Sequence, residues 1–165
     1  MSRFAGAVRN GAVIGLFACM LLAAGGGLSC SRDEGAKGGI SFEGERREDL
    51  LDVCEALFRH QFSQNASAAQ QDAAAYFLFV SEQDPPAALL DRFAGQRPPV
   101  QPGSAFEDGK GLLFRIDRIV WLDRDTVEAE GGYYEGNLSS SGNTYRLRRE
   151  GGTWKVISDE MNWIS

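Results

Sequence analysis

The sequence predicts an α+β domain in which an N-terminal amphipathic helix packs on a curved antiparallel sheet of four or five strands. Two observations support this fold class. Apolar residues recur at helical spacing over residues 46–62. From residue 111 onward, apolar and polar residues alternate as they do in half-buried strands. The links between these later segments are short, which favours antiparallel neighbours.

The predicted helix carries one apolar stripe, made by Leu50, Val53, Cys54, Leu57 and Phe58. Cys54 lies in the middle of this stripe, so we expect its thiol to be buried. His60 is the only histidine and comes near the end of the helix, where we expect it at the surface. It has no second histidine or cysteine beside it, so the sequence predicts no metal site.

The middle of the chain is predicted to add one strand and one short helix. Residues 73–80 are apolar on both faces and rich in aromatics, as in an interior strand, although their leading alanines would also suit a helix. Residues 84–95 read as a short helix that begins at Asp84-Pro85 and ends at Gly95. Residues 96–104 read as a proline-stiffened connection.

Four strand candidates follow, at residues 112–122, 125–136, 143–150 and 153–165. Their shared parity predicts an apolar face made by Val127, Ala129, Tyr145, Leu147, Trp154 and Val156. The opposite face carries Glu128, Glu130, Arg146, Arg148 and Lys155, which can form cross-strand charge pairs. The Ser-rich segment 137–143 is predicted to be the link between the second and third strands.

Arg115 and Asp117 interrupt the first of these strands and are the candidate pocket residues. Alternation favours an outward position for both of them, with Phe114, Ile116 and Val120 in the core. A second interpretation stays open, in which the two polar side chains line a pocket. Leu113, Ile119 and Trp121 share their parity, so this strand could be covered on both sides.

The closing residues 145–165, YRLRREGGTWKVISDEMNWIS, resemble the end of cystatin-like and NTF2-like domains. In those domains a strand with an aromatic residue leads to a glycine turn, a Trp and an apolar residue two positions on. The resemblance implies a helix on a curved antiparallel meander, in a superfamily that includes enzymes, ligand binders and scaffolds.

The chain has no Gly-rich phosphate loop, paired cysteines or convincing Ser-His-Asp set, so no catalytic residue is assigned. This favours a non-enzymatic domain that binds a protein partner or a small ligand without a cofactor. The alternative is a small NTF2-like enzyme that uses pocket carboxylates such as Asp117.

The N-terminus has the three parts of a secretory signal. Residues 1–10 carry Arg3 and Arg9 and no acid, residues 11–28 are uncharged, and the chain then becomes polar. The junction GLSC, residues 27–30, resembles the lipobox of bacterial lipoproteins. That resemblance implies a signal peptide at residues 1–29, a lipid on Cys30 and a place in the cell envelope, in the outer membrane if the organism is Gram-negative.

Alternatives to this N-terminal interpretation also stay open. LFAC, residues 16–19, fits the lipobox better but is followed by more apolar residues, and residues 11–28 could be retained as an anchor. A secreted protein without an anchor would differ only at Cys30. In the favoured interpretation residues 30–45 form a flexible tether and residues 46–165 one α+β domain.

The net charge of the chain indicates which classes of partner it can bind. The chain has 17 Lys and Arg against 23 Asp and Glu, a formal net charge of −6. Because an acidic surface repels phosphates, the sequence argues against nucleic acid as a partner. Lipid on Cys30, rather than surface charge, would hold the protein at a membrane.

Overall fold

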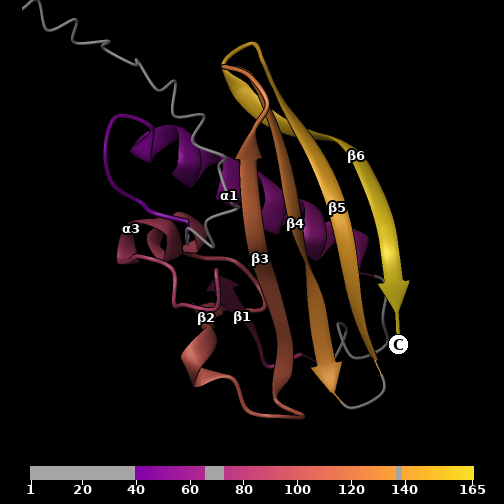
Figure 1. Ribbon diagram of the computed structural model, residues 1–165. Helices are drawn as coiled ribbons and strands as arrows, with labels where there is room; N and C mark the ends of the chain where they lie inside the picture. The colour runs from indigo at the N-terminus through magenta and orange to yellow at the C-terminus, as the bar shows by residue number, and fades with distance from the viewer. Residues whose placement is uncertain (1–39, 66–72, 137–138) are drawn as a thin grey trace, which may run out of the picture. The chain divides into compact units, whose positions relative to one another are not determined.

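The computed structural model describes residues 40–65, 73–136 and 139–165. Within these residues the chain has an α+β fold, with an N-terminal helix packed on a six-stranded, mostly antiparallel open sheet (Figure 1). The signal peptide predicted at residues 1–29 and the lipidation site Cys30 lie outside the described residues.

Helix α1 spans Arg47–Gln64, close to the predicted range of 46–62. Its apolar stripe is buried as expected, and Val53, Cys54, Leu57 and Phe58 are all inaccessible to solvent. Burial raises the pKa of the Cys54 thiol well above its ordinary value, because the apolar surroundings disfavour the thiolate. The prediction of a buried Cys54 is therefore confirmed.

The strands are β1 (Ala75–Val80), β2 (Val100–Pro102), β3 (Gly111–Trp121), β4 (Thr126–Gly136), β5 (Ser139–Glu150) and β6 (Thr153–Ile164). Their order across the sheet is β2-β1-β3-β4-β5-β6. The antiparallel part runs from β3 to β6, whereas β1 pairs in parallel with both β2 and β3. The expected wholly antiparallel sheet of four or five strands is corrected to a mixed sheet of six.

The structure confirms both elements predicted for the middle of the chain. The interior strand is β1, and the short helix is α3 (Ala87–Leu90), which continues as a 3-10 turn over Asp91–Phe93. Its predicted start at Asp84-Pro85 is wrong, because Pro86 is the N-cap and the Asp84 carboxylate bonds to Ser104. The connection at residues 96–104 contains a strand that was not predicted, β2, followed by a 3-10 turn at Gly103–Ala105. A three-residue edge strand that ends in proline has too little alternation to be recognised from sequence.

One correction matters for the site. Segment 137–143 was predicted to be a link, but β5 already begins at Ser139 and pairs with β4 from there. Serines, glycine and asparagine suggest a turn, but here they continue a strand because the neighbouring strands satisfy its backbone on both sides.

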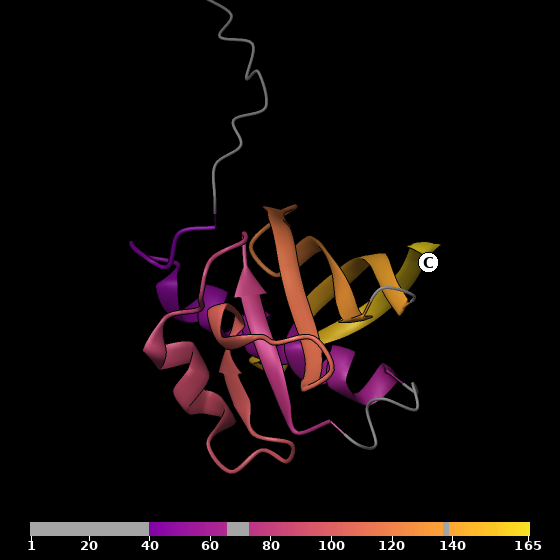
Figure 2. The same cartoon turned by 90° about the horizontal axis from the view of Figure 1, so that it is seen from below.

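The face of the sheet that packs against α1 is here called the inner face. Figure 1 shows α1 crossing behind β3 to β6, and Figure 2 shows the strands curving around it. The inner residues Val127, Leu147 and Trp154 are buried against the helix stripe. On the outer face, one of the predicted cross-strand charge pairs forms between Arg146 and Glu128, at 3.2 Å, while Glu130 pairs with Arg118, which was not in the predicted set.

Bulges change which residues face inward. In β3, Ile116 pairs with Gly131 but Arg118 pairs with Glu130, so Asp117 is an extra residue. Beyond it the parity is reversed, and Ile119 and Trp121 pack against the core in the place expected for Val120. Two similar shifts in β6 leave Ile157 and Asn162 unpaired.

The packed part of the chain includes residues that were assigned to the tether. Ile40 and Phe42 pack against the core, and the backbone N–H of Ile40 donates a hydrogen bond of 3.0 Å to Ser81 Oγ. The ordered domain therefore extends to Ile40 at least, ahead of the expected start at residue 46.

Candidate functional site

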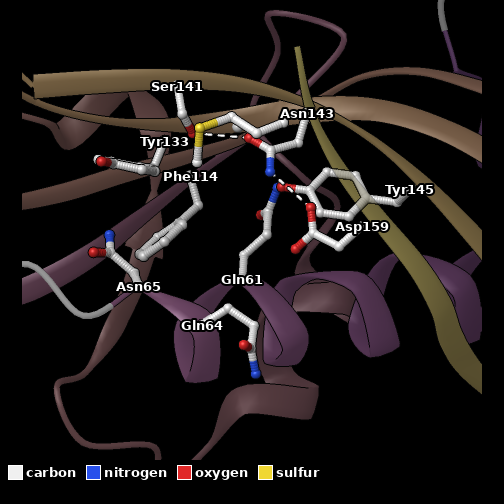
Figure 3. Close-up of a pocket in the computed structure, with 11 residues that line it drawn as sticks. Gln61, Gln64, Asn65, Phe114, Tyr133, Ser141, Asn143, Tyr145 and Asp159 are labelled. Carbon is white, nitrogen blue, oxygen red and sulfur yellow. Dashed lines mark hydrogen bonds between the residues drawn. The ribbon is translucent and has the colours of Figure 1, made fainter. Parts of the chain in front are cut away.

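A pocket of about 260 Å³ lies between the last turns of α1 and the inner face of β3 to β6. Its uncharged polar lining is made by Gln61, Gln64, Asn65, Ser141, Asn143 and Tyr145. Phe114, Tyr133 and Met161 supply the apolar lining, and Asp159 is the one charged lining residue among those the structure describes. Figure 3 shows these side chains converging from the helix below and the strands above.

A chain of hydrogen bonds runs along one wall of the pocket. Ser141 Oγ donates to Asn143 Oδ1 at 3.0 Å, and Asn143 Nδ2 donates to Asp159 Oδ1 at 2.7 Å (Figure 3). The other carboxylate oxygen, Asp159 Oδ2, lies 2.8 Å from His60 Nε2. Because an ionised carboxylate only accepts, this places the proton of the imidazole on Nε2.

His60 was expected to be a surface residue at the helix end, and this is corrected. Its side chain is only 22% exposed, since it packs edge-on against the Tyr145 ring and bonds to Asp159. The pair ties the helix to β6. Because each oxygen of Asp159 accepts one of these bonds, the carboxylate is held in a fixed orientation on the pocket wall.

Gln61 is the most deeply buried polar residue of the helix, with 5% of its surface exposed. Its Nε2 donates to the backbone oxygen of Arg115 at 3.2 Å and to Tyr145 Oη at 3.3 Å. The Arg115 carbonyl can only accept, which fixes the orientation of the amide. Gln61 Oε1 is then left buried with no hydrogen-bond partner among the described residues.

The Tyr145 hydroxyl complements this acceptor. It receives the hydrogen bond from Gln61, and no acceptor for its own proton lies within the described part of the chain. Burial raises the pKa of Tyr145 to about 12, so the hydroxyl keeps its proton at physiological pH. An unused acceptor and an unused donor therefore lie side by side on the pocket wall.

The sequence-derived candidates Arg115 and Asp117 lie on the outer face and do not line this pocket. Arg115 Nε bonds to Asp117 Oδ2 at 3.1 Å, and the guanidinium lies 5.7 Å from the centre of the Trp163 ring. Desolvation raises the pKa of Asp117 and outweighs the opposite effect of Arg115. Arg115 contributes to the pocket only through its backbone, which orients Gln61.

Two of the residues in this site could be recognised from sequence, and a third could not. Gln61 follows Leu57 and Phe58 at helical spacing, so it is a polar residue within the apolar stripe. Asn143 shares the parity of Tyr145, but it was placed at the junction between the predicted link and the start of the predicted strand. Asp159 faces inward only because of the bulge at Ile157, which alternation cannot predict.

No group of three or more His, Cys, Asp or Glu side chains that could hold a metal ion occurs in the described residues. Across residues 40–65, 73–136 and 139–165, no helix has the length and apolar character needed to cross a membrane. The sequence matches no protein-family model, no curated protein and no solved structure.

Proposed function

We propose that the chain is a non-enzymatic, lipid-anchored protein of the bacterial cell envelope whose α+β domain binds a small ligand in the pocket between helix and sheet. The observation that carries the proposal is the unmet pair on the pocket wall, Gln61 Oε1 and the Tyr145 hydroxyl. Buried polar groups are normally bonded, and a concave site with a few convergent polar groups is the usual form of a ligand site.

The choice of a binder over an enzyme rests on Asp159. A general base needs a carboxylate or imidazole within hydrogen-bond reach of the reacting proton. Asp159 is the only carboxylate lining the pocket within the described residues, and both of its oxygens already accept hydrogen bonds. The alternative, an enzyme that uses pocket carboxylates, would have to use Asp159 while it stays bonded to Asn143 and His60.

The arrangement of α1 on the strands β3 to β6 resembles the cystatin-like and NTF2-like arrangement, in which the enzymes of the superfamily place acids and histidines between helix and sheet. The parallel strands β1 and β2 depart from that pattern. Fold resemblance alone does not decide the function, so the pocket residues carry the proposal.

The membrane half of the proposal rests on the apolar-to-polar junction at Cys30 and is tested by metabolic labelling with a palmitate analogue. We expect label on the wild-type chain and on Cys19→Ser, and none on Cys30→Ser. Equal labelling of the wild type and Cys30→Ser would show that the lipid, if any, is attached elsewhere.

The binding half is tested on the ¹⁵N-labelled full chain in detergent, with a set of small neutral fragments. Binding should shift the side-chain amide signals of Gln61 and Asn143 and leave the indole signal of Trp154 in place. Ser141→Leu fills the pocket and should abolish these shifts, whereas Ser140→Leu, the next residue along β5, should keep them. Shifts that survive Ser141→Leu in a folded chain, or no shifts with any fragment, would refute pocket binding.

A further inference from the structure

The charges around the pocket exclude one class of ligand. Among the described residues no lysine or arginine lines it, and its single charged group, Asp159, is an acid. An anion placed here would lose its water and gain no cation in return, which is strongly unfavourable. A cation would meet only the Asp159 carboxylate, whose charge is already partly compensated by hydrogen bonds from Asn143 and His60. The pocket therefore suits a neutral ligand.

The hydrogen-bonding pattern favours hydroxyl groups. Gln61 Oε1 needs a donor, and the Tyr145 hydroxyl beside it needs an acceptor. A hydroxyl group both donates and accepts, so one or two neighbouring hydroxyls would satisfy both groups at once. Ser141 Oγ and the second N–H of Asn143 extend this pattern along the same wall.

The opposite wall is apolar. Figure 3 shows Phe114 and Tyr133 on one side of the pocket and Asn143 and Tyr145 on the other. The volume of about 260 Å³ is below the roughly 300–1,000 Å³ typical of sites for drug-sized molecules. The occupant is thus a small molecule with hydroxyls along one edge and C–H groups along a face.

We propose that the pocket binds a neutral carbohydrate. One sugar ring would lie between two walls of the pocket. Gln61, Asn143 and Tyr145 would form hydrogen bonds to its hydroxyls, and Phe114 and Tyr133 would pack against its apolar face. This inference rests on the proposed function, since it names the ligand class of the same pocket. A sugar ring has both required surfaces, hydroxyls at its rim and C–H bonds on its faces.

The test uses four compounds that share one ring and differ in charge: glucose, N-acetylglucosamine, glucosamine and glucuronate. Each is titrated into the ¹⁵N-labelled full chain in detergent while the side-chain amide signals of Gln61 and Asn143 are followed. The two neutral sugars should bind at least tenfold more tightly than glucuronate, and glucosamine no more tightly than glucose. Stronger binding of either charged sugar would overturn the proposal.

Two variants locate the binding. Tyr145→Phe removes the unused donor and should weaken binding of the neutral sugars by about three- to tenfold, the effect of one hydrogen bond. Tyr134→Phe removes a hydroxyl from the neighbouring strand outside the pocket and should leave binding unchanged. If Tyr145→Phe bound the neutral sugars as tightly as wild type, the Tyr145 hydroxyl would not donate a hydrogen bond to the sugar, and the proposed binding mode would be wrong.

N-methylacetamide and cyclohexanol separate the failure of this inference from the failure of the proposed function. If either compound shifts the pocket signals while no sugar does, the sugar proposal is wrong and pocket binding stands. If sugars and fragments all leave the signals unmoved, both proposals are wrong.

Discussion

The two ends of strand β5 differ in the side chains that they turn toward the helix. At one end Leu147 is fully buried beside Val127 and Trp154 in the apolar core. At the other end Ser141 and Asn143 occupy the same inner face and line the pocket. Strand β5 therefore supplies both core and candidate site, and the change from one to the other occurs within seven residues, 141–147.

Helix α1 changes character at the same place. The end of the sheet around Leu147 is here called the dry end, and the end that lines the pocket is called the polar end. The helix stripe is apolar over the dry end, from Leu50 to Phe58, and becomes polar at Gln61 over the polar end. Matching polarity on two elements far apart in sequence means that the polar groups can bond to one another, as Gln61 does to Tyr145. We infer that the dry end supplies most of the stability and the polar end is available for binding.

The largest expected effect is that of Trp154→Ala at the dry end. Trp154 is 4% exposed, packs edge-on against Trp121 and lies under the guanidinium of Arg149. Removing a buried aromatic side chain of this size costs about 3–5 kcal/mol in the free energy of unfolding, which would bring a small domain near to unfolding. Chemical denaturation followed by circular dichroism measures the loss.

The matched control is Trp163→Ala, because that ring is 47% exposed on the outer face. It should cost about 1 kcal/mol or less. Similar losses for the two tryptophans would mean that stability is not concentrated in the dry end.

A smaller effect is expected for Asn143→Ala at the polar end. The change removes the donor to Asp159 Oδ1 but leaves the bond from His60 to Oδ2, so the carboxylate stays partly satisfied. A loss of about 1–3 kcal/mol follows for one hydrogen bond to a charged group.

Arg146→Ala, which breaks the exposed pair with Glu128, serves as the control for Asn143→Ala and should cost less than about 1 kcal/mol. If Asn143→Ala proved as costly as Trp154→Ala, the comparison of the two ends would fail, because the polar end would carry as much stability as the core.

The smallest effect concerns Asp117 on the outer face, whose pKa is raised by desolvation. An acid with a raised pKa in the folded state holds its proton more tightly there, so it favours folding at low pH and loses this contribution as pH rises above the ordinary aspartate range. Asp117→Asn removes this dependence. Relative to wild type, the variant should therefore gain slightly in stability between about pH 4 and about pH 7.

Denaturant unfolding of both proteins at the two pH values measures this difference. A relative loss for Asp117→Asn at the higher pH would mean that the ion pair with Arg115, rather than desolvation, dominates at Asp117.

The comparison of the two ends also shows which features of the structure could be predicted from sequence and which could not. Helix α1, the strands of the meander and the buried Cys54 follow from periodicity, because packing on one face demands it. The parallel pairing of β1 could not be predicted, since it depends on which strands meet in space. The pocket was missed because its residues resemble a link in β5 and because Asp159 turns inward only through a bulge in β6.

The extra residue at Asp117 shifts the alternation of inward and outward side chains along β3 by one position. Before it, even-numbered residues such as Phe114 and Ile116 face the core, and after it odd-numbered residues such as Ile119 do. Deleting Asp117 would leave Arg118 opposite Glu130, would keep Ile119 and Trp121 facing the core, and would straighten the strand. The bulge is therefore a place where β3 can lose a residue while the strand keeps its register on both sides.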